Sequence, residues 1–146
     1  MQNSNPSQIK SKKLKLNFKD SKYATGRRKR SIAKVWVKKG NGNIHVNGMK
    51  MNEYFKRPVH QIIVTRPLEI TQVSTNYDVK CSVKGGGLSG QAGAIILGIS
   101  KALIAHDENL KKNLKKDKLT TRDSRVVERK KYGHRKARRS FQFSKR

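Results

Sequence analysis

Apolar residues recur at regular intervals along the chain, beginning at residue 31. Between residues 31 and 39, apolar residues alternate with Lys34, Trp36 and Lys38, which is the period of a strand with one buried face. The run ends at Gly40-Asn41-Gly42, a turn signal, and a shorter alternation follows at residues 44–46. We therefore predict that these two runs form a hairpin with one buried face.

Further along the chain, the apolar spacing changes between the periods of strands and helices. Residues 77–83 alternate between apolar and polar side chains, which predicts another strand with one apolar face. Between Leu88 and Leu103, apolar residues recur at helical spacing, which predicts the main core helix. Weaker patterns predict short helices at 51–55 and 59–64, a strand at 68–73 and a lysine-rich amphipathic helix at 108–117.

Both ends of the chain carry too few apolar residues to build a core. We interpret residues 1–22 as a disordered basic arm, and they lack the apolar segment of a signal peptide. Residues 120–146 would span about 80 to 90 Å if fully extended, at roughly 3.3 Å per residue. The chain thus divides into an N-terminal extension (1–22), a globular domain (23–119) and an extended basic tail (120–146).

The charge of the chain indicates a polyanionic partner. Its 36 Lys and Arg residues against 9 Asp and Glu residues give a formal net charge of +27 and a pI near 10.8. Nucleic acid fits this balance best, because no unbroken apolar run approaches the roughly 18 residues of a membrane-spanning helix. Cys81 is the only cysteine, so an intrachain disulfide is excluded and a reducing compartment is expected.

Two basic clusters are the candidate RNA-binding segments. The first follows Gly26, and the second runs through the tail, where cations alternate with Tyr132, His134, Phe141 and Phe143. Arginine binds phosphate oxygens, and aromatic rings stack on unpaired bases, so this pattern favours RNA over a nuclear-localisation signal or a generic polybasic tail. The predicted RNA-binding residues are Arg27, Arg28, Lys29, Arg30, Arg122, Arg125, Arg129, Lys130, Lys131, Arg135, Lys136, Arg138 and Arg139.

The glycine-rich segment after the strand at 77–83 raises the alternative of a dinucleotide-binding enzyme. Gly85, Gly87 and Gly90 satisfy G-x-G-x-x-G, but the helix is followed by lysine-rich sequence, not by the second parallel strand of such a fold. We read the segment as a tight strand-to-helix connection, in which Gly87 has no room for a side chain. The four histidines are scattered without metal-ligand or catalytic spacing, so we expect no metal, no cofactor and no enzymatic activity.

From about Tyr23 to Arg146, the sequence closely resembles bacterial-type small ribosomal subunit protein nine. The resemblance rests on the following segments: Thr25-Gly26-Arg27-Arg28-Lys29, Gly40-Asn41-Gly42, Arg66-Pro67-Leu68-Glu69, Gly85–Ala94, Thr121-Arg122-Asp123, Glu128-Arg129-Lys130-Lys131, Lys136-Ala137-Arg138-Arg139 and Gln142-Phe143-Ser144-Lys145-Arg146. Residues 1–22 fall outside it, and Phe141 stands where many bacterial members have proline.

The resemblance implies an α+β fold, a single small domain with a mixed β-sheet covered by helices. It implies a non-enzymatic constituent of the small ribosomal subunit that binds ribosomal RNA in the subunit head, beside other head proteins. Such a protein works in the bacterial cytoplasm, the mitochondrial matrix or the plastid stroma. In the family the terminal residues approach transfer RNA in the P site, so the expected tRNA-binding residues are Ser144, Lys145 and Arg146.

Two other classes of function compete with this reading. An extra-ribosomal regulator or a chromatin-like packing protein would bind duplexes broadly, whereas a ribosomal protein would co-purify with the small subunit through a salt wash. A nucleotide-dependent enzyme would bind a dinucleotide saturably.

Trp36, on the lysine-bearing side of its strand, either stacks on RNA or packs under a neighbouring helix.

Overall fold

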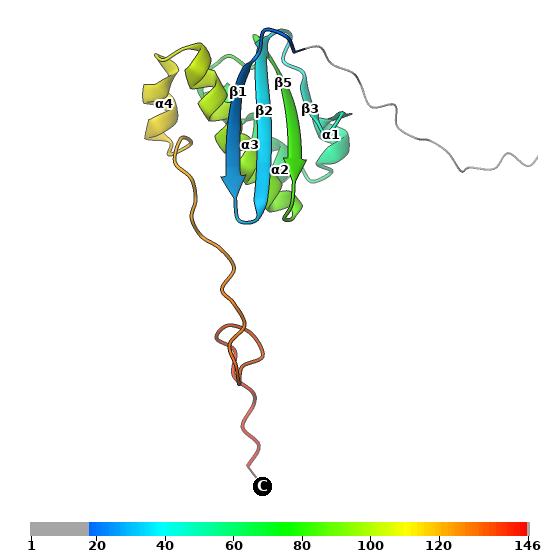
Figure 1. Cartoon of the computed structure of the whole chain (residues 1–146), viewed down its shortest axis with the longest axis vertical. Helices are drawn as coiled ribbons and strands as arrows, with labels where there is room; N and C mark the ends of the chain where they lie inside the picture. The colour runs from blue at the N-terminus through cyan, green and yellow to red at the C-terminus, as the bar shows by residue number, and fades with distance from the viewer. Residues whose placement is uncertain (1–17, 146) are drawn as a thin grey trace, which may run out of the picture.

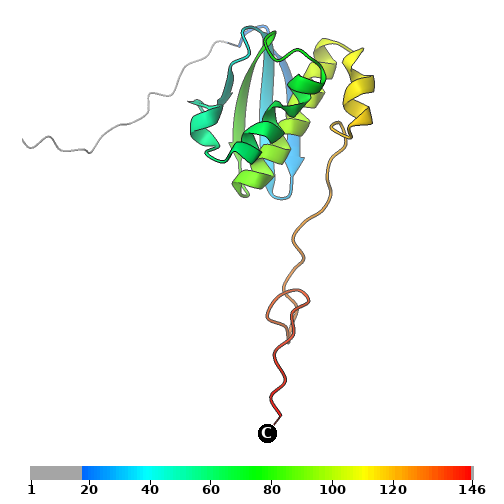
Figure 2. The ribbon, with the colours of Figure 1, turned by 180° about the vertical axis from the view of Figure 1, so that it is seen from behind.

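The computed structural model describes residues 18–145 as one α+β domain followed by a long tail (Figure 1). The elements in chain order are β1 (Lys22–Arg28), β2 (Ser31–Lys39), β3 (Ile44–Val46), β4 (Met49–Lys50), α1 (Met51–Tyr54), α2 (Pro58–Ile70), β5 (Tyr77–Lys84), α3 (Leu88–His106) and α4 (Leu110–Lys116). Helices α2 and α3 lie behind the sheet in Figure 1 and in front of it in Figure 2. The predicted fold class, a mixed sheet covered by helices, is confirmed.

The five strands form one sheet in the order β1-β2-β5-β3-β4. β1 and β5 both pair antiparallel with β2, whereas β3 pairs parallel with β5. The predicted hairpin of residues 31–39 with 44–46 is therefore wrong, because β5 lies between them. β2 and β5 pair from Ile32 opposite Lys84 to Lys39 opposite Tyr77, a far longer ladder than the three residues of β3 would allow.

The alternation along β2 and β5 divides the sheet into a buried and an open face, as predicted. Val35 and Val37 on β2 and Val79 on β5 are fully buried against the helices. α3 supplies the opposite wall with buried residues over most of its length, including Ile95 and Ile99. α3 is long and apolar enough to cross a membrane, since an 18-residue stretch of it has a mean hydropathy of 1.5. Packing accounts for this apolar character, because 61% of that stretch is buried inside the domain.

The strand predicted at 68–73 is wrong, because α2 continues through Pro67 as far as Ile70. Pro67 cannot donate a helical hydrogen bond, but it is buried beside Val64 and Leu68, so tertiary packing outweighs the loss. The helix ends at Thr71, whose hydroxyl donates to the carbonyl of Pro67 at 2.8 Å. The short helices predicted at 51–55 and 59–64 correspond to α1 and the first half of α2.

β1 packs so closely on α3 that only glycine fits where they cross. A methyl group at Gly26 would overlap the carbonyl oxygen of Ala94, and one at Gly98 would meet Cγ2 of Val35, on the neighbouring strand β2, at 2.5 Å. Gly26 is therefore a buried packing residue. This contact fixes where the basic turn that follows β1 emerges from the domain.

Candidate nucleic-acid interface

The basic cluster at residues 27–30 spans the end of β1 and its turn into β2. Arg27, Lys29 and Arg30 are exposed, whereas Arg28 is half-buried. Lys29 has a φ of 51°, the left-handed conformation that closes the turn. The turn thus presents three of the four predicted cations to solvent and directs the fourth onto α3.

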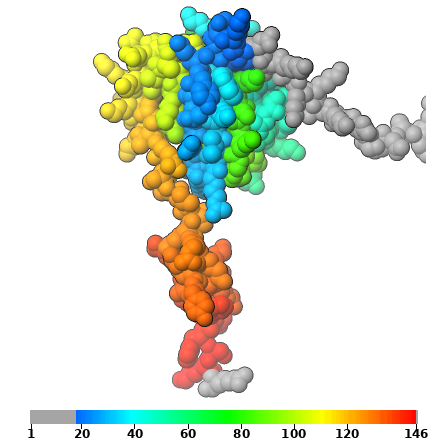
Figure 3. Space-filling view, viewed as in Figure 1, coloured from blue at the N-terminus to red at the C-terminus, as the bar shows by residue number. Residues whose placement is uncertain are grey.

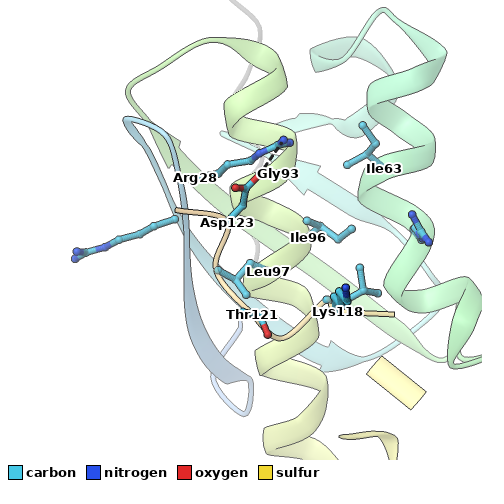
Figure 4. Close-up of a pocket in the computed structure, with 11 residues that line it drawn as sticks. Arg28, Ile63, Gly93, Ile96, Leu97, Lys118, Thr121 and Asp123 are labelled. Atoms are coloured by element: carbon cyan, nitrogen blue, oxygen red, sulfur yellow. Dashed lines mark ion pairs between the residues drawn. The ribbon is translucent and has the colours of Figure 1, made fainter. Parts of the chain in front are cut away.

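Arg28 connects the domain to the start of the tail. Its side chain occupies the space above Gly93, where a methyl group would overlap the Arg28 Cδ atom. From there the guanidinium Nη2 lies 3.4 Å from Oδ2 of Asp123 (Figure 4). Two segments about a hundred residues apart are therefore held together, a contact that sequence spacing did not reveal.

Asp123 also binds Arg125, two residues further along the tail. Oδ1 accepts hydrogen bonds from the Arg125 backbone N–H and Nε, and Oδ2 accepts one from Nη2 at 2.9 Å. These hydrogen bonds, with a smaller contribution from the charge of Arg28, hold the pKa of the Asp123 carboxyl far below its usual range. Asp123 therefore stays ionised, and two predicted RNA-binding residues, Arg28 and Arg125, share it in the free protein.

A cavity of about 210 Å³ lies at this junction (Figure 4). Apolar Ile63 and Ile96 come from α2 and α3, and Thr121 and Asp123 come from the tail. The cavity has a mixed lining of apolar side chains and cations, the cations being Arg27, Arg28, Arg66 and Lys118. Its chemistry suits an anionic group next to an apolar surface.

The glycine-rich connection between β5 and α3 differs from the prediction in one respect. Gly85 and Gly86 have φ values of +74° and +62°, and a side chain on Gly86 would overlap Ser31 Oγ. Gly87 has an ordinary φ of −106° and no atom within 4 Å of its Cβ position, so the expectation that it has no room for a side chain is wrong. The strained positions are the two preceding glycines.

The strand order also removes the context that a dinucleotide site needs. α3 is followed by α4 and the tail, and β5 has the antiparallel strand β2 on one side. The only parallel neighbour, β3, precedes β5 in the chain. Within residues 18–145, no group of three or more His, Cys, Asp or Glu residues is placed to hold a metal ion.

The tail leaves the domain as an exposed chain and extends far from it (Figures 1 and 3). Leu119 is the last residue of the hydrophobic core. Beyond it, the predicted cations Arg122, Arg129, Lys130, Lys131, Arg135, Lys136, Arg138 and Arg139 are all exposed. Tyr132 and Phe143 are 103% and 85% exposed, so their rings are free to stack.

The tail is not fully extended, because it closes a loop between residues 131 and 139. Gly133 has a φ of +71°, and the Arg135 backbone N–H donates to the Arg139 carbonyl at 2.8 Å. Arg138 Nε binds Glu128 Oε2 at 3.0 Å, and the Arg135 guanidinium carbon lies 5.4 Å from the centre of the Phe141 ring. Sequence reasoning missed this loop, although Gly133 was an available turn signal.

The predicted tRNA-binding tip is described in part. Ser144 and Lys145 are exposed at the end of the tail, whereas Arg146 lies outside the described residues. Residues 1–17, most of the predicted N-terminal arm, also lie outside them. Within the described residues, the cations predicted to bind RNA therefore fall into three groups: the β1–β2 turn, the root of the tail and the distal tail.

Comparison with known protein families finds a match over most of the chain. The model of the family described as ribosomal protein S9/S16 matches residues 26–146. The matched region begins at the Gly26 contact with α3 and includes all the predicted RNA-binding and tRNA-binding residues.

Proposed function

The chain belongs to the ribosomal protein S9/S16 family, and from this membership we propose how its parts divide the work of binding RNA in the ribosome. As a member of this family, it is a structural protein of the small ribosomal subunit, with ribosomal RNA and other ribosomal proteins as partners. In our proposal, residues 23–119 anchor the protein in the subunit head, and residues 120–146 follow a path through ribosomal RNA towards P-site transfer RNA.

The observation that carries this proposal is the exposed, cation-rich tail that projects from a compact domain (Figure 3). A chain segment without a core is stabilised only by its partner, and a polyanion both supplies the compensating charge and releases counterions on contact. A tail with few apolar residues is unsuited to a protein groove, whereas arginine and exposed aromatic side chains bind phosphates and unpaired bases.

The clasp of Arg28, Asp123 and Arg125 orients the root of the tail. Its Arg28–Asp123 pair joins the tail to the β1–β2 turn in the free protein, which brings the two basic segments close together. Exposed ion pairs contribute little stability, and phosphates can compete for both arginines. We therefore propose that the clasp directs the tail and then shares its arginines with ribosomal RNA.

The tip acts differently from the rest of the tail. Most tail cations lie between Arg122 and Arg139, so they suffice to hold the tail along ribosomal RNA. In our proposal, Ser144, Lys145 and Arg146 contact the anticodon stem-loop of transfer RNA. Each charge-assisted hydrogen bond lost from the tip would cost about 1.5 to 3 kcal/mol at most.

Two measurements test this division. First, the tagged full-length chain should sediment stoichiometrically with the small subunit through a high-salt wash, and recovery only as a free protein or with duplex DNA would contradict the assignment. Second, a chain lacking Lys145 and Arg146 should assemble normally but release P-site transfer RNA faster, most visibly at low magnesium. A block in assembly together with unchanged release rates would show that the tip is an anchor.

A further inference from the structure

The sheet has one face that the helices leave open. In Figure 1 this face is turned towards the viewer, with α2 and α3 behind it. The register places Trp36 opposite Tyr23 on one side and Lys80 on the other, so these three side chains share the open face. Following the same alternation, the open face consists of Tyr23, Thr25, Arg27, Ile32, Lys34, Trp36, Lys38, Asp78, Lys80, Ser82 and Lys84.

Positive charge dominates this face. Lys34, Lys38 and Lys84 are exposed and form no ion pair among residues 18–145. Asp78 is the only acid in β1, β2 or β5, and its Oδ1 already accepts the backbone N–H groups of Asn41 and Asn43 at 3.0 and 2.8 Å. Asp78 lies opposite Lys38 on the same face, so this one carboxylate offsets only part of the positive charge of the face.

Aromatic rings lie among these cations. The Tyr23 and Trp36 ring centres are 5.3 Å apart with their planes tilted by 43°, and Tyr23 is 50% exposed. Lys80 Nζ lies 5.9 Å from the centre of the Trp36 ring and 5.8 Å from that of Phe18, which adds a third ring at the edge. Trp36 thus does not pack under a helix, one of the two positions expected for it; it lies among cations on the open face.

We propose that this face binds a single-stranded segment of RNA, separately from the tail. Lys34 and Lys38 flank Trp36 on one strand at intervals of about 6.6 Å, so phosphates on either side of a stacked base would each meet a cation. Stacking requires unpaired bases, because a duplex hides the faces of its bases. An acidic protein would satisfy the lysines but would make no use of the aromatic pair.

The intrinsic fluorescence of the chain reports on this site directly, because Trp36 is the only tryptophan. Titrating the full-length protein with a short oligouridylate should quench Trp36 saturably, and the quenching should weaken with salt. Replacing both Lys34 and Lys84 with Gln should reduce the slope of log affinity against log salt by about 1.4, at roughly 0.7 per phosphate contact on a single strand. Tyr23→Leu should weaken binding by about fivefold or more, the loss expected from one stacked base.

Matched variants separate this face from the tail. Lys111→Gln with Lys115→Gln removes the same charge from exposed positions on α4 and should leave the quenching curve unchanged. A second variant, Arg129→Gln with Lys130→Gln and Lys131→Gln, weakens RNA binding by the tail. Saturable quenching of Trp36 should persist in this variant. Circular dichroism spectra identical to that of the unmodified chain would confirm that the variants fold.

Several results would overturn the proposal. Absence of quenching would do so, as would an equal response of the open-face and α4 variants. Equal quenching by an RNA duplex would exclude base stacking, and equal quenching by polyglutamate would indicate an acidic protein partner. None of these results bears on sedimentation with the small subunit, so failure here is distinguishable from failure of the proposed ribosomal function.

Discussion

Neutralising three adjacent tail cations should change the salt dependence of RNA binding by a calculable amount. We consider Arg129, Lys130 and Lys131, each replaced by Gln. All three are exposed, and none forms an ion pair with an acid among the described residues. They lie beyond Leu119, the last core residue, so the free energy of unfolding of the domain should stay the same.

The magnitude follows from counterion release. Each phosphate contact contributes roughly 0.9 to the slope of log affinity against log salt on a duplex, so losing three contacts should reduce the slope by about 2.7. When the salt concentration rises from 50 to 200 mM, the affinity for head-domain ribosomal RNA should fall for both chains. The fall should be about 40-fold smaller for the variant than for the unmodified chain. Filter binding across this range of salt would measure both slopes.

The matched control replaces Lys111, Lys112 and Lys115 on α4, where the same charge is removed away from the tail. If net charge alone governs binding, the two triple variants will show the same slope. That result would refute the assignment of phosphate contacts to the tail, and so would a tail variant whose slope equals that of the unmodified chain.

Three further predictions concern the domain and the root of the tail. Gly86→Val should lower the free energy of unfolding by at least about 1 to 2 kcal/mol, because Gly86 has a positive φ. Gly87→Val should hardly change the free energy of unfolding, because its Cβ position is open. Equal decreases of the free energy of unfolding in urea titrations of the two variants would contradict this prediction. Burial raises the pKa of the Cys81 thiol, so it should react with iodoacetamide at pH 8 only as fast as the domain opens, and rapid labelling of the native protein would disagree. Because the folded-state pKa of Asp123 is lowered, the stability that its clasp contributes is fully present above the unfolded pKa of about 3.9 and is lost as the pH falls from there through the folded-state pKa. At neutral pH, Asp123→Asn should speed tryptic cleavage at Arg125, and unchanged cleavage would show that the clasp does not order the tail.

The elements that sequence patterns predicted correctly are those whose own residues carry the signal. β2, β5 and α3 each show a full apolar period, so their type follows from burial on one face. β1 was missed as a strand, because its inward side near α3 carries Ala24 and Gly26, small residues that allow close approach without an apolar pattern. The pairing of β5 between β2 and β3 depends on tertiary packing, which a local pattern does not contain.

The candidate interface was predicted at the level of segments but not of geometry. The charge clusters identified which parts of the chain carry cations, because charge is a property of composition. The contact of Arg28 with Asp123 was not foreseen, since it depends on the groove left by Gly93 on α3. The loop at residues 131–139 was also missed, because charge repulsion alone favours extension, whereas Gly133 and the pair of Arg138 with Glu128 close it.

The most direct test of the central claim is to map which RNA lies beside the tip of the tail in assembled subunits. Because Cys81 is buried, Ser144→Cys provides a single reactive thiol that can carry an iron chelate generating hydroxyl radicals. With transfer RNA in the P site, we predict cleavage of its anticodon stem-loop from position 144 and none from a Lys115→Cys control on α4. Cleavage of ribosomal RNA alone from position 144, with transfer RNA intact, would contradict the account.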